Sequence, residues 1–268
     1  MISLHRTQFP GSKAEFAQAM DDSLRQYFSK TEPSLTISAR VFPYLDEIAI
    51  TFDGAQFDGK FPPLPKLAGQ TKWACEAGIV TLSGRDVTVL GAPVNVQLQA
   101  RDVVFHTGQA ENGEVLLLLH NVRAGQAVIS ATQLDLEDAI RTIAQREGQK
   151  QGISVEETRV SLRARGARSL AADVRLRARK FLLRANIDVA AQIDIEQDFS
   201  AKLSNLKCRG DGMLGSLACD LLNSLLQTLE GKKFSIMPLL YGEIRLHDIR
   251  MAVADTVEIT ADFGSASV

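Results

Sequence analysis

Basic side chains crowd one short part of the chain. Residues 160–185 hold eight arginines and lysines and a single acid, Asp173, although the net charge of the whole chain is only −2. Arg175, Arg177 and Arg179 alternate there with apolar residues, and alternate residues of a strand share a face. Two interpretations follow, which are a solvated outer face of a sheet and a surface for the anionic headgroups of a membrane.

A glycine-rich motif stands between a predicted strand and a predicted helix. Gly210, Gly212 and Gly215 spell GxGxxG, the pattern of a dinucleotide-binding loop. Such a loop belongs to a βαβ unit with a parallel sheet, whereas the neighbouring strands follow one another through short turns, which favours antiparallel pairing. We therefore interpret this stretch as a flexible turn before a helix that Asp211 caps.

The other polar residues do not form a catalytic or metal-binding pattern. The four histidines lack HExxH or paired spacing, the carboxylates are scattered, and there is no GxSxG or GxxxxGK[ST] motif. No aromatic residues interleave the basic ones, which argues against nucleic-acid binding. The sequence therefore predicts no enzymatic activity, no cofactor, no metal and no nucleic-acid partner.

Cysteine usage and hydropathy indicate an intracellular protein. Cys75, Cys208 and Cys219 are an odd, sparse set without CxxC spacing, which predicts reduced thiols, and Cys219 beside leucines is typical of a buried, inert thiol. The N-terminal residues lack the apolar run of a signal peptide, and no stretch approaches the ~18 to 20 apolar residues of a membrane span. We expect a cytoplasmic protein, with peripheral membrane contact as the alternative.

Three helices and many strands must position these residues. The first helix begins at the capping box Ser12–Glu15, the second runs from about residue 134 to 147 and is closed by Gly148, and the third begins after Asp211 and ends at Gly231. Seven leucines cover about half of the circumference of the third helix, which predicts that sheet surrounds it. The apolar stripe of the first helix comprises Phe16, Met20, Leu24, Tyr27 and Phe28.

One predicted strand is unusually long. Residues 183–195 keep a single alternating phase, whereas strands usually have about 5 to 6 residues. A strand of this length twists and coils, so we expect it to curve around the third helix. Because strands mostly follow strands, the sequence predicts one α+β domain, residues 1–268, in which a long, strongly curved antiparallel sheet wraps around apolar helices.

Four stretches together carry a resemblance to a known family. They are VFPYLDEIAITFDG at 41–54, AVISATQLDLEDAI at 127–140, LGSLACDLLNSLLQTLEGKKF at 214–234 and GEIRLHDIRMAVADTVEITADF at 242–263. In this order they resemble the LmeA-like phospholipid-binding family of the tubular lipid-binding superfamily, over about residues 14–263. This chain departs from the many members that carry a signal or anchor segment. The resemblance implies helices inside a curved sheet, an elongated groove that holds acyl chains, and no catalytic residues.

The function expected from this resemblance is non-enzymatic binding, or transfer, of a lipid or fatty-acid-like ligand. Arg175, Arg177 and Arg179 would then meet headgroups or an anionic membrane. The alternative is a structural or scaffolding protein with a fully packed core and a basic sheet face that binds a partner. The expected wall of the acyl-chain groove comprises Phe16, Met20, Leu24, Leu176, Ile187, Val189, Leu217, Leu221 and Leu225.

Overall fold

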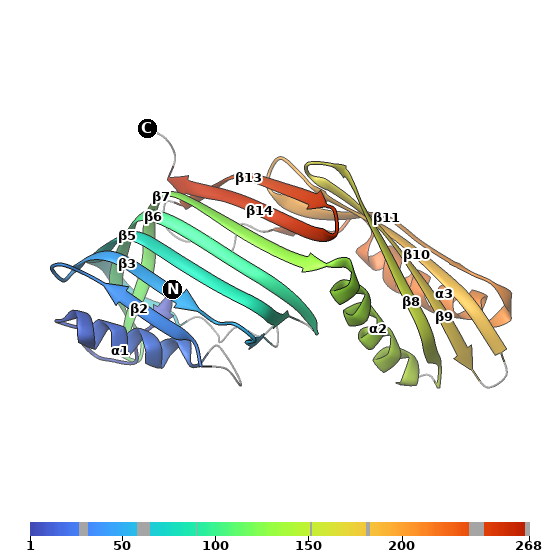
Figure 1. Cartoon of the computed structure of the whole chain (residues 1–268), viewed down its shortest axis with the longest axis horizontal. Coiled ribbons are helices and arrows are strands. Elements are labelled where there is room, and N and C mark those ends of the chain that lie inside the picture. Colours follow the sequence, from blue (N-terminus) through green and yellow to red (C-terminus); the bar gives the residue numbers. More distant parts are fainter. Residues whose placement is uncertain are drawn as a thin grey trace.

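The computed structural model consists mostly of two open β-sheets, with three helices in the part of the chain that it describes (Figure 1). The α+β class expected from the sequence is confirmed. The predicted stripe residues Tyr27 and Phe28, and the side chains of Leu221 and Leu225, lie outside the described residues. The structure describes residues 1–26, 32–57, 65–89, 91–150, 152–180, 183–235 and 244–265, without the side chains of Phe57, Leu221, Ser224, Leu225, Phe234 and Ser235.

The larger sheet has nine strands in the order β13-β14-β7-β6-β5-β3-β2, with β1 paired to β7 and β4 paired to β5. Its strands are β1 (Ile2–Ser3), β2 (Ser34–Ser38), β3 (Tyr44–Thr51), β4 (Gln56–Phe57), β5 (Leu67–Val89), β6 (Ala92–Ala110), β7 (Val115–Thr132), β13 (Ile244–Val253) and β14 (Thr256–Ser265).

The sequence had suggested a wholly antiparallel sheet, and this is wrong for the larger sheet. Both β3 and β4 run parallel to β5, while the other pairs are antiparallel. Strands β3 and β4 keep one register with β5, from Tyr44 opposite Glu76 to Phe57 opposite Val89, so they follow β5 in a single interrupted pass.

The smaller sheet has five strands in the order β12-β11-β10-β9-β8, and all its pairs are antiparallel. Its strand β10 covers Leu183–Ile195, so the long strand expected from the alternating phase is confirmed. Ala185 and Ile187 are buried on one face of β10, whereas Asn186 and Asp188 are exposed on the other. The other strands are β8 (Ser154–Gly166), β9 (Ser169–Lys180), β11 (Ser200–Gly210) and β12 (Lys233–Ser235).

Helix α1 (Lys13–Leu24) packs into the hydrophobic core of the larger sheet. Ser12 occupies the N-cap, and its hydroxyl accepts a hydrogen bond from the Glu15 amide. The Glu15 carboxylate reaches back to the amide of Gly11, one residue before the cap, and so completes a capping-box-like pair. Phe16 is fully buried and its ring packs against those of Phe9 and Phe42, which also stack on each other.

Helix α2 (Gln133–Lys150) protects the edge of the smaller sheet. The sequence had suggested that Gly148 ends this helix, but the helix continues two residues past it, to Lys150. Strand β8 is an edge strand, and the amide of Val160 donates to the Glu137 carboxylate at 2.9 Å, while the Gln145 amide donates to the carbonyl of Val155 at 3.2 Å. These side chains occupy edge groups that would otherwise be free to pair with another strand.

Helix α3 (Gly212–Leu229) packs against β10 and β11, and the glycine motif explains how closely it does so. A Cβ atom on Gly210 would lie 2.2 Å from the carbonyl oxygen of Gly215, which no side chain permits. The two glycines therefore allow the helix backbone to touch the strand. The strands β11 and β12 that flank α3 pair antiparallel, so this motif does not lie in the βαβ unit of a dinucleotide site.

Polar contacts tie both ends of α3 to the sheet. The Asp211 carboxylate makes no cap hydrogen bond, contrary to expectation, and instead accepts from the backbone and side-chain amides of Asn186. At the other end, the Glu230 carboxylate accepts from the amides of Asn205 and Leu206, at 3.0 and 2.8 Å. These two residues form a bulge in β11, so each end of the helix is anchored to a different strand.

A disulfide joins Cys208 of β11 to Cys219 of α3, and the expectation of reduced thiols is wrong for this pair. The close approach at the glycines places the two Cα atoms 5.4 Å apart, within the range that a disulfide spans. Disulfides persist mainly in oxidising compartments, which counts against the cytoplasmic location expected from the sequence. None of the described helices is long and apolar enough to cross a membrane.

The two sheets meet where the β8–β9 turn contacts β13. The amide of Met251 donates to the carbonyl of Ala167 at 2.6 Å, and Arg168 forms an ion pair with Asp248 at 2.5 Å. The Arg168 guanidinium also lies over the ring of Phe199, which packs against the core of the larger sheet. The joint therefore combines a backbone bond, an ion pair and apolar packing.

The packing of α3 can be tested with one buried and one exposed position. Ile187→Ala removes a side chain that is buried beneath the helix, and we expect it to lower the free energy of unfolding by about 2 to 5 kcal/mol. Leu217→Ala on α3 is the control, because that side chain is 57% exposed and its loss should cost no more than about 0.5 kcal/mol. Urea unfolding measures both, and equal losses would contradict this packing.

The disulfide should contribute measurably to stability. Cys208→Ser combined with Cys219→Ser opens a loop of sequence separation 11, and we expect a loss of about 2 to 3 kcal/mol from the greater freedom of the unfolded chain. Urea unfolding with and without a thiol reductant checks this directly. The reductant should destabilise the wild type and leave the double variant unchanged; a wild type that is insensitive to reductant would contradict the assignment.

Candidate functional site

The residues expected to form one groove lie in two separate clusters. Phe16, Met20 and Leu24 are buried in the core of the larger sheet. Ile187, with the half-buried Leu176 and Val189, packs beneath α3 on the smaller sheet. Leu217 points to solvent. The described residues therefore do not assemble into the single wall that the sequence suggested, and those in the two clusters serve as core packing.

A different apolar surface is built by the register of the larger sheet. Three rows of directly opposed residues cross β5, β6, β7, β14 and β13 on one face, and almost every member is aliphatic or aromatic. We call this the apolar face. Its rows are Val80–Ala100–Gly125–Phe263–Leu246, Leu82–Leu98–Ala127–Ala261–Ile249 and Gly84–Val96–Ile129–Ile259–Met251.

Among the described residues of the apolar face, two large side chains remain exposed to solvent. The first row is buried at every side chain, and the third row is buried at its last residue, Met251. In the same third row, Ile129 and Ile259 stand directly opposite each other and remain 46% and 41% exposed. Half-buried neighbours surround this pair and complete what we call the apolar window, which comprises Val96, Leu98, Ala127, Ile129, Ile259 and Ala261.

The window offers apolar side chains and no hydrogen-bonding side chains. Strand β7 pairs with both β6 and β14, and β14 pairs with both β7 and β13, so the backbone groups around Ile129 and Ile259 are already engaged in the ladder. The six side chains of the window carry no polar atom. Polar residues alternate onto the opposite face, where the Gln126 amide donates to Asp262 at 2.9 Å. A molecule in the window would therefore meet a surface without hydrogen-bonding groups.

The predicted arginine face is the outer face of the smaller sheet, and each of its three arginines has an acidic partner. Arg175 pairs with Asp188 on β10 at 2.7 Å and Arg177 with a β8 glutamate, Glu157, at 3.1 Å. Arg179 pairs with Glu156 at 3.3 Å. These ion pairs cross from strand to strand in a ladder, which favours the interpretation of a solvated sheet face.

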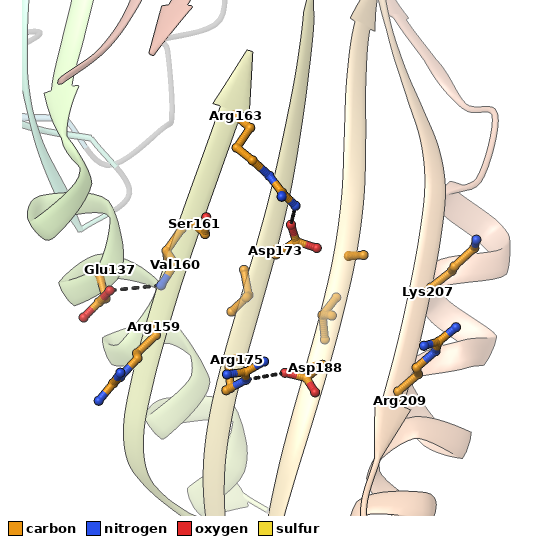
Figure 2. Close-up of a pocket in the computed structure, with 13 residues that line it drawn as sticks. Glu137, Arg159, Val160, Ser161, Arg163, Asp173, Arg175, Asp188, Lys207 and Arg209 are labelled. Carbon is orange, nitrogen blue, oxygen red and sulfur yellow. Dashed lines mark hydrogen bonds and ion pairs between the residues drawn. The ribbon is translucent and has the colours of Figure 1, made fainter. Parts of the chain in front are cut away.

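The outer face is hollowed beside this ladder. Figure 2 shows Arg163, Arg175, Asp188, Lys207 and Arg209 on one side of the sheet, with α2 and α3 behind it. The hollow has a volume of about 780 Å³ and is open to solvent. Five basic and three acidic side chains line it, so its net charge is positive but much smaller than the basic stretch of sequence suggested.

Two basic residues of the hollow were missed by the sequence interpretation. Lys207 and Arg209 on β11 are exposed, and neither forms an ion pair with the described residues. They lie opposite Ala190 and Asp188 in the β10–β11 register, so they share the outer face with Arg175. Their alternation within KCRG was visible in the sequence, but only the strand pairing shows which face they join.

Among the described residues, groups with chemical reactivity do not assemble into a catalytic or metal-binding cluster. Burial raises the pKa of the Cys75 thiol to about 12, with a further contribution from Glu76, so this thiol is protonated at neutral pH. The rings of His106 and His120 stack with their centroids 3.7 Å apart. Among the described residues, no group of three or more histidine, cysteine or acidic side chains is placed to hold a metal ion.

No family model, curated protein or solved structure matches this chain. Its function must therefore be argued from its own residues and their geometry.

The anchor between Asp211 and β10 should make the protein acid-sensitive. Hydrogen bonds from Asn186, first from its backbone amide and then from its side chain, lower the pKa of the Asp211 carboxyl below its ordinary value. A carboxyl whose pKa is lower in the folded state contributes stability that is present at neutral pH and is lost as the pH falls through the acidic range. We expect Asp211→Asn to lose less stability than the wild type between neutral pH and about pH 3.

Urea midpoints measured across that range test this prediction. Asp220→Asn is the matched control. Asp220 is an exposed carboxylate on α3, and it accepts no hydrogen bond from a strand amide among the described residues. The loss of stability with acid should be smaller in Asp211→Asn than in this charge-matched variant. An Asp211→Asn protein whose stability falls with acid as steeply as the wild type would contradict the role of this anchor.

Proposed function

We propose that the protein binds the acyl chain of a lipid or fatty acid on the apolar window, without catalysing a reaction. The observation that carries this proposal is the pair Ile129 and Ile259, which face each other in register and remain 46% and 41% exposed on an otherwise covered apolar face. Isolated exposed aliphatic residues are common on protein surfaces, whereas exposed ones that continue a buried apolar face mark a binding surface.

The chemistry of the window favours a hydrocarbon chain over a peptide. A peptide that adds to a sheet needs a free edge, and the strands of the window are paired on both sides. A peptide laid across the window would leave its own amides without partners, at a cost of about 1 to 3 kcal/mol each. An acyl chain has no such groups and gains about 0.8 kcal/mol for each methylene removed from water.

A second candidate function is binding of an anionic partner on the outer face of the smaller sheet, as a scaffold. The observation in its favour is that Lys207 and Arg209 stand in an open hollow without ion pairs to the described residues. The arginines that first suggested such a surface are engaged with acids. The remaining positive charge is small, and we therefore place this function second.

A charge placed in the window should weaken acyl-chain binding. Ile259→Glu puts a carboxylate among aliphatic side chains, and an acyl chain could then bind only by removing that carboxylate from water. We expect the affinity for a fluorescent fatty acid to fall by about tenfold or more, which corresponds to ~1.4 kcal/mol. Direct titration of the purified protein with the fatty acid measures this.

Thr260→Glu is the matched control, because Thr260 is the next residue of β14 and faces Arg250 on the polar side of the sheet. This variant adds the same charge and should bind the fatty acid like the wild type. Equal affinity of the two variants, or a wild type that does not bind the fatty acid at all, would contradict acyl-chain binding at the window.

A further inference from the structure

A second set of exposed apolar side chains lies far from the window, at the start of α3 and the end of the β9–β10 hairpin. Met213 and Leu217 are 70% and 57% exposed, and Leu183 is 48% exposed. Met213 and Leu217 are four residues apart and so lie on the same side of the helix. Figure 1 places this end of the smaller sheet at the opposite end of the molecule from α1.

Contacts between the hairpin and the helix bring these residues to one end of the sheet. The Asn186 amide donates to Asp211 at 2.7 Å, immediately before α3 begins. One turn further on, a Cβ atom on Gly215 would lie 3.4 Å from the Ala185 side chain. Leu183 follows Ala185 on the same face of β10, two residues closer to the hairpin end. Leu183 therefore lies toward the end of the sheet at which α3 begins.

Basic residues flank this apolar group. Lys180 stands directly opposite Leu183 in the β9–β10 register, and Arg184 is exposed on the other face of the hairpin. Neither has an ion pair with the described residues, unlike the arginines further along β9. We call Lys180, Leu183, Arg184, Met213 and Leu217 the distal tip.

We propose that the distal tip docks the protein on the surface of an anionic lipid bilayer, with its apolar residues among the acyl chains and its basic residues at the headgroups. Apolar side chains next to Lys and Arg are the combination that holds proteins at a membrane interface. Each basic residue near an anionic bilayer strengthens binding by about fivefold. Asp220 continues the stripe of Met213 and Leu217 along α3 and sets the limit of insertion.

The size of the tip favours a bilayer over a protein partner. Stable protein interfaces bury about 1,200 Å² or more in total, which three apolar side chains at the end of a molecule do not supply. A bilayer needs no matching shape and accepts a few inserted side chains together with a positive charge. The proposal does not depend on acyl-chain binding at the window, because the two surfaces share no residue.

Vesicle flotation of the full chain tests the tip. The probes are vesicles of phosphatidylcholine alone and of phosphatidylcholine mixed with phosphatidylserine. We expect the wild type to float with the mixed vesicles only, and to lose binding as salt shortens the range of the electrostatic attraction. Met213→Gln with Leu217→Gln should reduce binding by about tenfold or more, and Lys180→Gln with Arg184→Gln by about fivefold for each charge.

Matched controls separate the tip from other surfaces. Leu134→Gln removes an apolar side chain of similar exposure on α2, and Arg175→Gln with Arg177→Gln removes two charges from the outer face. Both controls should float like the wild type. A wild type that does not float, tip variants that float as well as the wild type, or controls that lose as much binding as the tip variants would each overturn the proposal. Unfolding curves verify that every variant is folded.

Discussion

Apolar and polar residues alternate along strands of ten or more residues, so each sheet has one hydrophobic face. The rest of the structure depends on how that face is covered. On the smaller sheet, α3 covers it. On the larger sheet, α1 and the side chains from the joint with the smaller sheet cover most of it. Among the described residues, the part of this face that stays exposed is the apolar window around Ile129 and Ile259.

Covering the smaller sheet requires α3 to be held very close to it. Two glycines remove the side chains that would prevent contact, and a disulfide crosses the contact from Cys208 to Cys219. Carboxylates at the two ends of the helix bind strand amides. These features together explain a stretch of sequence that reads as a nucleotide-binding motif but serves packing. They also hold the first turn of α3 at the end of the molecule, where Met213 is exposed.

Segments with a regular alternation of apolar and polar residues were predicted correctly as strands, whereas a segment with an interrupted alternation was missed. The 13 residues of β10 keep one phase without interruption, and the structure has the strand at those bounds. Strand β5 was missed because register shifts interrupt its alternation three times along 23 residues. The α+β class followed from the order of elements, whereas the division into two sheets and the parallel pairing of β3 with β5 depend on contacts between distant segments.

The same distinction applies to the candidate site. Arg175 and Arg177 were correctly placed on one outer face, because a strand dictates it, but their acidic partners come from the neighbouring strands β10 and β8 and could not be read from β9 alone. Ile129 and Ile259 are 130 residues apart, and only the β7–β14 register brings them together. The disulfide was missed for a related reason, since its spacing belongs to no motif and depends on the glycine contact.

Mass spectrometry of whatever copurifies with the protein, prepared without detergent and extracted with organic solvent, tests the central claim most directly. If the apolar window holds a hydrocarbon chain, the extract will contain one acyl-bearing class of molecule in an amount comparable to the protein, and the Ile259→Glu variant will lack it. A clean protein with no acyl-bearing molecule in the extract, and none taken up on exposure to fatty acid, would contradict the account.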